Sequence, residues 1–343
     1  MSLRRHLKLK SFLLGVFLVA MFLLSLFLGA EKIPVKHILL LLVSRIPLIG
    51  SNISLEGISA TEETILLVLR LPRAIGALLV GMSLAGSGTI YQAVLENPMA
   101  DPYILGVSAG AAFGASLSIT MGLYPTALYA FLGAAGAMLI VTQLSARIVP
   151  ARRNTLLLTG VALSFLLSSL VTLIIALRRS HADRILFWTM GSLSAIRVTS
   201  LLWAAPLMLL SLLAFFYYHR ELDLLSLGEE EARTTGLEVH KVKQRLLFFA
   251  TLSTGTAVAI SGIIGFVGLI VPHAMRFIFG HTHRRLLISS LTFGAGFLLL
   301  CDTLARTLIA PSTLPLGVIT SVLGAPYFLF LLSRSTIRGG DDA

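Results

Sequence analysis

Three arginines at the ends of apolar segments have the chemistry to bind carboxylates. Arg70 and Arg73 bracket a Leu-Pro pair near the start of a long apolar segment, and Arg306 lies four residues after Asp302 near the end of another. Because a guanidinium forms bidentate pairs with a carboxylate, this set could dock an acidic patch of another protein. Two alternatives remain: the side chains could reach lipid headgroups, or Arg306 could pair with Asp302 on one helix face.

The segment Leu222–Arg245 is the one long polar stretch in the second half of the chain. Within it, three glutamates at positions 229 to 231 precede Ala232 and Arg233, with Gly228 and Gly236 on either side. Acids favour the first turn of a helix and glycine favours its end, so the pattern predicts a short helix. A merely solvated loop has no need of such a helix between apolar leucines. We interpret the segment as a structured loop in water that contacts another protein.

The sequence contains no set of residues for catalysis, metal binding or nucleotide binding. It has no Gly-Lys-Ser or Gly-Lys-Thr, which a phosphate-binding P-loop requires. His281 and His283 are too few for a metal site, so we expect them to be solvated loop residues. The single cysteine, Cys301, excludes an intrachain disulfide. We therefore expect a chain that is not an enzyme and that binds no cofactor itself.

Composition places the chain in a membrane. Of its 343 residues, 56% are hydrophobic and only 13% are charged, whereas soluble domains are about a quarter charged. The net charge of +11 comes from bases in short segments between apolar runs, a distribution that orients a protein in a bilayer. Membrane lipid is therefore an expected partner, and nucleic acid is not.

Apolar segments predict ten membrane helices, which form a single transmembrane domain over residues 1–343. The first segment could be a signal peptide, but its length and the membrane character of the later chain favour a retained helix. Residues 269–280 are too few to cross alone, which predicts a half-helix buried among others. The ten predicted spans are 12–28, 64–95, 103–121, 125–146, 155–177, 199–218, 243–261, 269–280, 286–304 and 315–333.

The distribution of basic residues predicts how the chain is oriented in the membrane, and internal sequence similarity predicts a structural repeat. Ten spans put both termini on one side, and most of the 27 Lys and Arg residues fall there, which predicts cytoplasmic termini and a cytoplasmic Leu222–Arg245. A shift of 174 residues aligns 78–106 with 252–280, matching several Gly and Pro residues. These copies would cross the membrane in opposite directions, as in transporters built from inverted repeats. Chance similarity between two helices rich in small residues is the alternative.

Five motifs stand in order along the chain. They are Arg70-Leu-Pro-Arg73, Leu79-Val-Gly81 to Gly88, Glu96-Asn-Pro-Met-Ala-Asp-Pro102 with Leu105-Gly-Val-Ser-Ala-Gly110, Gly265-Phe-Val-Gly-Leu-Ile-Val-Pro-His273, and Leu314-Pro-Leu-Gly-Val-Ile-Thr320 with Gly324-Ala-Pro326. Together they resemble the FecCD-type permeases, the membrane subunits of ABC importers for iron-siderophores, haem and vitamin B12. The resemblance covers nearly the whole chain.

The resemblance implies an all-α polytopic membrane protein of about ten helices, the permease of a type II ABC importer. It implies a homodimer in a bacterial or archaeal cytoplasmic (inner) membrane, with a pathway at the two-fold axis lined by helices five and ten. Two cytoplasmic ATPase subunits would bind ATP and Mg²⁺. One periplasmic or extracellular binding protein would deliver a siderophore, haem or cobalamin, and the residues do not distinguish among these cargoes.

The resemblance also implies roles for individual residues. Arg70, Arg73 and Arg306 would meet acidic residues of the binding protein, so replacing the first two with Glu should weaken docking and leave the fold intact. The cytoplasmic gates would be Asn97-Pro98-Met99 and the Arg153-Asn154 turn, although that turn is more basic than the family's small polar pair. The residues that couple to the ATPase, within 222–245, would be Ser226, Leu227, Gly228, Glu229, Glu230, Ala232, Arg233 and Gly236.

Two other classes of protein remain as alternatives. An ion-coupled secondary transporter is the first, but a proton relay needs more acids within the spans than Asp302. A membrane-embedded enzyme is the second, and it would need a reactive constellation within a span, which the sequence lacks. The importer subunit is therefore the favoured interpretation.

Overall fold

The computed structural model describes residues 2–45, 55, 57–147 and 155–338, and in this part of the chain the regular structure is helical. Ten helical segments match the ten expected spans, so the predicted fold class is confirmed. They are α1 (Ser2–Phe27), the continuous α3, η2 and α4 (Ala60–Glu63, Thr64–Arg70 and Leu71–Val94), α5 (Val107–Met121), α6 (Thr126–Arg147), α7 (Thr155–Leu177), α9 (Val198–Tyr217), α12 (Val239–Ser261), α13 (Val267–Phe279), α14 (His283–Thr307) and α15 (Leu316–Arg338).

Hydropathy and length alone identify only part of this set. Among the described residues, 6 helices are long and apolar enough to cross a membrane, in α1, α3–α4, α6, α7, α9 and α14. α5 and α13 have 15 and 13 residues. At 1.5 Å per residue they extend about 22 Å and 20 Å, less than a hydrocarbon core of about 30 Å. The short α13 was expected, whereas α5 begins later than expected because residues 102–105 form turns.

The remaining described helices are short. They are α2 (Val35–Ser44), the 3-10 turn η3 (Arg179–His181), α8 (Ala182–Thr189), α10 (His219–Leu225) and α11 (Glu229–Thr234). α11 confirms the short helix predicted from the three glutamates, and Gly236, with a φ of +86°, follows its end. α8 was not expected, although Asp183 in its first turn followed by apolar residues is a signal that could have indicated it.

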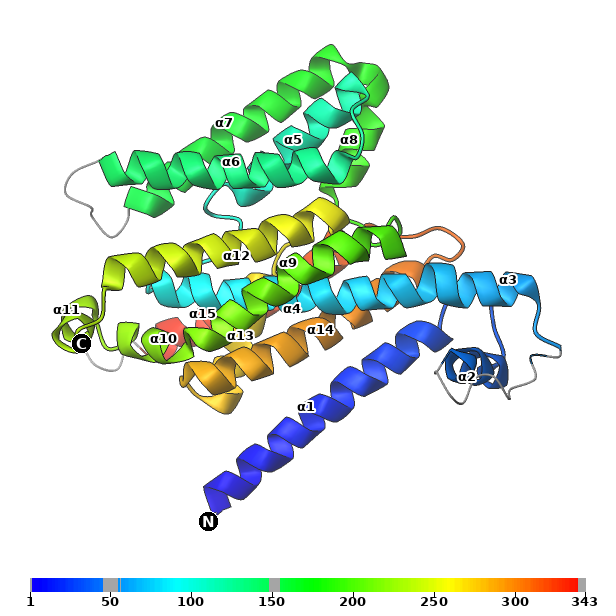
Figure 1. Ribbon diagram of the computed structural model, residues 1–343, viewed down its shortest axis with the longest axis horizontal. Coiled ribbons are helices and arrows are strands. Elements are labelled where there is room, and N and C mark those ends of the chain that lie inside the picture. The colour runs from blue at the N-terminus through cyan, green and yellow to red at the C-terminus, as the bar shows by residue number, and fades with distance from the viewer. Residues whose placement is uncertain (1, 46–54, 56, 148–154, 339–343) are drawn as a thin grey trace.

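The helices form a body and a lobe (Figure 1). α4, α9, α12, α13, α14 and α15 make the body, α1 lies against α14, and α5, α6, α7 and α8 make the lobe. The lobe joins the body where α5 and α6 pack against α12. α2 and α3 lie at one end of the body, and α10 and α11 lie at the other. Below, these are called the α3 end and the α11 end.

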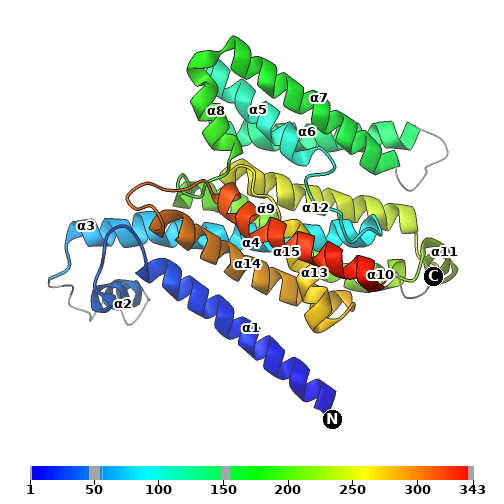
Figure 2. The same cartoon turned by 180° about the vertical axis from the view of Figure 1, so that it is seen from behind.

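The internal repeat appears as a set of four helices that occurs twice. α4 to α7 follow the order long, short, long, long, and α12 to α15 follow the same order. The first helix of each set packs against the second and third helices of the other set: α4 contacts α13 and α14, and α12 contacts α5 and α6. α4 and α12 lie side by side and run in opposite directions (Figure 2). The inverted repeat is therefore confirmed.

Candidate functional site

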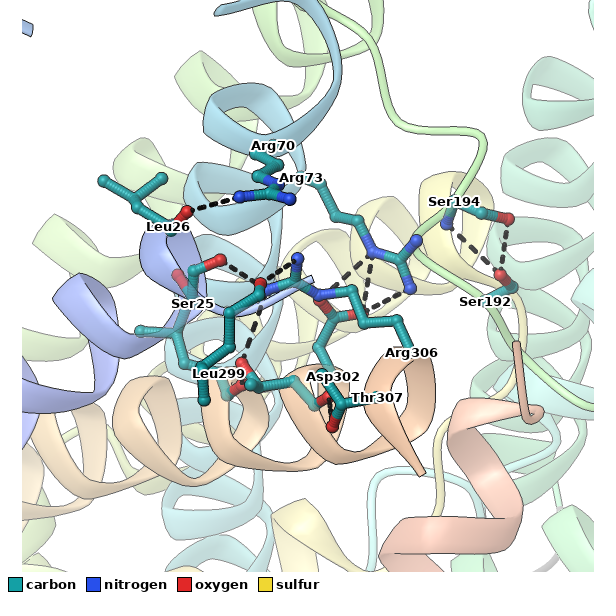
Figure 3. Close-up of polar contacts among 12 residues, drawn as sticks. Ser25, Leu26, Arg70, Arg73, Ser192, Ser194, Leu299, Asp302, Arg306 and Thr307 are labelled. Atoms are coloured by element: carbon teal, nitrogen blue, oxygen red, sulfur yellow. Dashed lines mark hydrogen bonds and ion pairs between the residues drawn. The ribbon is translucent and has the colours of Figure 1, made fainter. Parts of the chain in front are cut away.

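Asp302 on α14 holds two of the three arginines singled out in the sequence (Figure 3). Arg73 Nε and Nη2 lie 2.9 Å and 2.8 Å from Asp302 Oδ1. Arg306 Nε lies 3.3 Å from Asp302 Oδ2. Asp302 is only 1% exposed, so these ion pairs take the place of water around its carboxylate. The expected pairing of Asp302 with Arg306 is confirmed, and Arg73 joins it from α4.

Arg70 and Arg306 bind the C-terminal end of α1. Arg70 Nη1 donates to Leu26 O and Arg306 Nη1 donates to Leu28 O, each at 3.0 Å. Their other terminal nitrogens donate to the carbonyls of Glu31 and Ser25. The last carbonyls of a helix lack intrahelical donors and carry the negative end of its dipole. The two arginines therefore cap α1. With Arg73 and Asp302 they form what we call the arginine cluster.

Two of the three arginines of the predicted docking set are buried. Arg70 and Arg306 are only 6% and 8% exposed. The helix runs continuously through Pro72, the second residue of α4, and the π-helical turn Thr64–Arg70 lies directly before α4. A docking role for these arginines stays a prediction. Arg73, with 15% of its side chain exposed, is the most accessible of the three.

A cavity of about 690 Å³ lies between the lobe and the body. Its wall combines a charged pair, Asp183 and Arg184 on α8, with the aromatic rings of Trp188 and Trp203, and the ends of α5, α6, α9 and α12 complete it. Sequence reasoning missed Asp183, Arg184 and Trp188 because it assigned no element between the spans 155–177 and 199–218. The unexpected helix α8 thus forms one wall of a substantial cavity.

The predicted coupling residues lie on α11 and its flanking turns, at the end of the body opposite α3 (Figure 1). Ala232 is buried in one hydrophobic core with Leu222 and Leu225 of α10 and Leu246 of α12. Gly228 and Glu229 are half-buried, and the exposed members of the set are Ser226, Leu227, Glu230, Arg233 and Gly236. We call these residues the coupling surface. Its root, Ala232, is buried in the core of the body, and its exposed side chains are accessible to a partner, as a docking element requires.

Asp223 fixes α10 to the start of α14. Its Oδ1 lies 2.8 Å from both the backbone N and the Nδ1 of His283. The expectation that His283 is solvated is therefore wrong, because α10 packs over the first turn of α14 and leaves His283 4% exposed. His281 is exposed, as expected. The contact places the coupling surface at a fixed position on the body.

Asn97, Pro98 and Met99 form the turn that follows α4, at the α11 end of the body. Asn97 Oδ1 accepts a hydrogen bond from Met99 N at 2.9 Å, which is a turn that asparagine favours. Pro98 and Met99 are exposed. Just beyond, burial raises the pKa of the Asp101 carboxyl to about 6. The gate role of this turn stays a prediction, and the second gate candidate, Arg153-Asn154, lies outside the described residues.

Comparison with known proteins identifies the family of this chain. The model of the FecCD transport family matches residues 17–334. The chain belongs to the FecCD transport family. This match, across an all-helical fold with an inverted repeat, confirms the resemblance seen in the motifs, and the chain is a multi-pass membrane permease.

Members of the FecCD family with named functions are similar over most of their length. The hemin transport system permease protein HmuU of Yersinia pestis is 42% identical over 275 residues, 78% of this chain and 82% of that protein. The Fe(3+) dicitrate transport system permease protein FecD of Escherichia coli is 40% identical over 276 residues, 79% and 85% of the two chains. A solved inward-facing structure described as a metal-chelate type ABC transporter has a TM-score of 0.82 and 32% identity, covering 94% of this chain and 98% of that one.

Proposed function

We propose that this FecCD permease is the membrane-spanning subunit of an ATP-driven ABC importer for an iron chelate, haem or cobalamin. The observation that carries the proposal is the coupling surface, where exposed side chains of α11 and its turns stand on a root buried in the body. In this proposal the surface lies in the cytoplasm, docks on a separate ATPase and bears the predicted coupling residues. ATP and Mg²⁺ are bound by two such ATPase subunits, and this chain binds no cofactor.

A second copy of the chain completes the pathway in this proposal. Among the described residues of α7, only Gly160 and Val171 are buried. The exposed face of this apolar helix, away from α5 and α6, is therefore available to lipid or to another copy. α7 and α15 are the fifth and tenth of the ten helical segments that match the expected spans, and we assign them to the two-fold axis. Both termini lie in the cytoplasm, and a binding protein delivers cargo at the α3 end.

The transport cycle depends on two arrangements of the same helices. Binding of ATP closes the ATPase pair, and α11 transmits that closure to the body through its buried root. The pathway at the two-fold axis then opens on one side of the membrane and closes on the other, because nucleotide and cargo favour different arrangements of the helices. Asp302 does not suit an ion-coupled cycle, since two arginines hold its carboxylate and a proton carrier must release and regain its proton.

Reconstitution in proteoliposomes tests this function. The chain is combined with a candidate ABC ATPase and a candidate binding protein from the same organism, and haem, a ferric siderophore and cobalamin are offered in turn. We expect uptake of one cargo that requires ATP and all three proteins. Uptake by the permease alone, driven by an ion gradient, would refute the proposal and support the secondary transporter.

A further inference from the structure

Lys243 forms ion pairs both with the first residue of α11 and with the turn that follows α4. It lies in the second turn of α12, and its Nζ is 2.5 Å from Glu229 Oε1 and 3.5 Å from Glu96 Oε1. Glu229 is the first residue of α11, and Glu96 directly precedes Asn97. One ammonium group thus lies between two carboxylates from distant parts of the chain.

This bridge is better shielded from solvent than an ordinary surface ion pair. The Lys243 and Glu96 side chains are 18% and 20% exposed, and Glu229 is 42% exposed. Charges in such a position are less screened by salt than fully exposed ones, so their attraction acts over the gap between the elements. Lysine suits the position because its compact ammonium carries three donors that can serve two acceptors.

Both carboxylates belong to backbone that the surrounding structure holds in place. Glu96 has a φ of +46°, a left-handed conformation that is uncommon for residues other than glycine. Such a conformation persists only where neighbouring contacts enforce it. Glu229 begins a helix whose Ala232 is buried in the core. A displacement of α11 therefore changes the distance from Glu229 to Lys243. The attraction between the Lys243 ammonium and the Glu96 carboxylate changes with it.

We propose that Lys243 is a positioning residue that transmits movement of α11 to the turn at residues 96–99. The inference rests on the function proposed above, in which α11 receives the motion of the ATPase. While α11 is at rest, Lys243 holds the Glu96 carboxylate close to Glu229, and the backbone hydrogen bonds Glu96 N to Ala93 O and Asn97 N to Gln92 O keep Glu96 in its left-handed conformation. When α11 moves, Glu229 and Glu96 compete for one ammonium group, and the turn that carries Pro98 and Met99 shifts.

The test replaces Lys243 with Met, which keeps the unbranched side chain up to one atom short of the ammonium nitrogen and removes the charge. Lys241→Met is the matched control, because Lys241 lies on the same helix, is 60% exposed and pairs only locally with Glu238. In proteoliposomes with the ATPase and binding protein, we expect Lys243→Met to hydrolyse ATP at the normal rate while cargo moved per ATP falls about tenfold, the effect of a coupling of ordinary size. Lys241→Met should transport normally.

A double-mutant cycle separates transmission from simple loss of structure. If Lys243 and Glu96 act through one contact, Lys243→Met combined with Glu96→Gln should transport no worse than Lys243→Met alone. The inference is overturned if Lys243→Met transports like Lys241→Met, or if transport, ATP hydrolysis and assembly with the ATPase decline together. If the unmodified chain shows no ATP-dependent transport, the proposed function fails instead.

Discussion

The arginine cluster and the coupling surface are both charged, but the first is enclosed by protein and the second is open to solvent. Arg70 and Arg306 are 6% and 8% exposed, and their donors are used on Asp302 and on the carbonyls of α1. Glu230 and Arg233 on α11 are exposed. Buried charges must be paired, whereas exposed charges need no partner within the chain. Substitutions in the first region should therefore change stability, and those in the second should change the binding of a partner.

Replacing Asp302 should have the largest effect and tests whether the arginine cluster is structural. Asp302→Asn leaves Arg73 and Arg306 without a counter-charge in a buried site, and breaking a buried pair costs about 3–5 kcal/mol. We expect a large drop in the melting temperature of the protein in detergent. Asp183→Asn, at an exposed position, is the control and should shift stability by less than about 0.5 kcal/mol. Equal melting temperatures for the two variants would contradict the burial of the cluster.

Replacing Arg70 separates capping of α1 from docking. Arg70→Met removes the donors to Leu26 O and Glu31 O, and hydrogen bonds to charged groups contribute about 1.5–3 kcal/mol. Hydrogen exchange at residues 24–28 should accelerate, and Arg45→Met, whose side chain is 61% exposed, should leave it unchanged. The docking role led us to expect an intact fold after replacement of Arg70 and Arg73 with Glu, whereas their contacts with α1 and Asp302 lead us to expect a loss of stability. Unchanged exchange with weakened binding-protein affinity would restore the docking role.

Replacing Leu227 tests the opposite prediction at the coupling surface. Leu227 is 67% exposed, so Leu227→Asp should leave the melting temperature almost unchanged. An apolar residue that is exposed here but buried in a complex can act as a hot spot, and we expect affinity for the ATPase to fall about tenfold or more. Binding measured by co-purification and titration checks this. Leu177→Asp, equally apolar and 73% exposed on α7, is the control and should retain ATPase affinity.

The smallest effect concerns Asp101, a half-buried acid at the α11 end. Its pKa is raised from 3.8 to about 6, so between these values the folded protein holds a proton that the unfolded chain releases. Stability should therefore fall as the pH rises through about 4 to 6 and change no further from this group above that range. Asp101→Asn mimics the protonated acid, and its melting temperature relative to the unmodified protein should increase across the same window. If the melting temperature of Asp101→Asn minus that of the unmodified protein decreases as the pH rises, the assignment is contradicted.

Hydropathy located the membrane helices but did not show which of them are buried. The span in α7 has a mean hydropathy of 2.4 and is 11% buried, whereas the span in α14 has 1.7 and is 72% buried. In a bilayer, lipid accepts an apolar surface as readily as the protein interior does, so hydrophobicity cannot distinguish the two environments. The start of α5 and the existence of α8 were missed for a related reason. Both depend on turns and short amphipathic segments, which give weak local signals.

The sequence by itself determined the ten membrane segments, the inverted repeat, the short helix α11 and membership of the FecCD family, because each is encoded in local pattern or in motif order. The tertiary structure alone decided which charged side chains are buried and which partners they contact. It turned Arg70 and Arg306 onto the end of α1, covered His283 with α10, and brought Glu96 and Glu229 to Lys243. These contacts join residues far apart in the chain, and a charge finds its partner only when packing brings the two together.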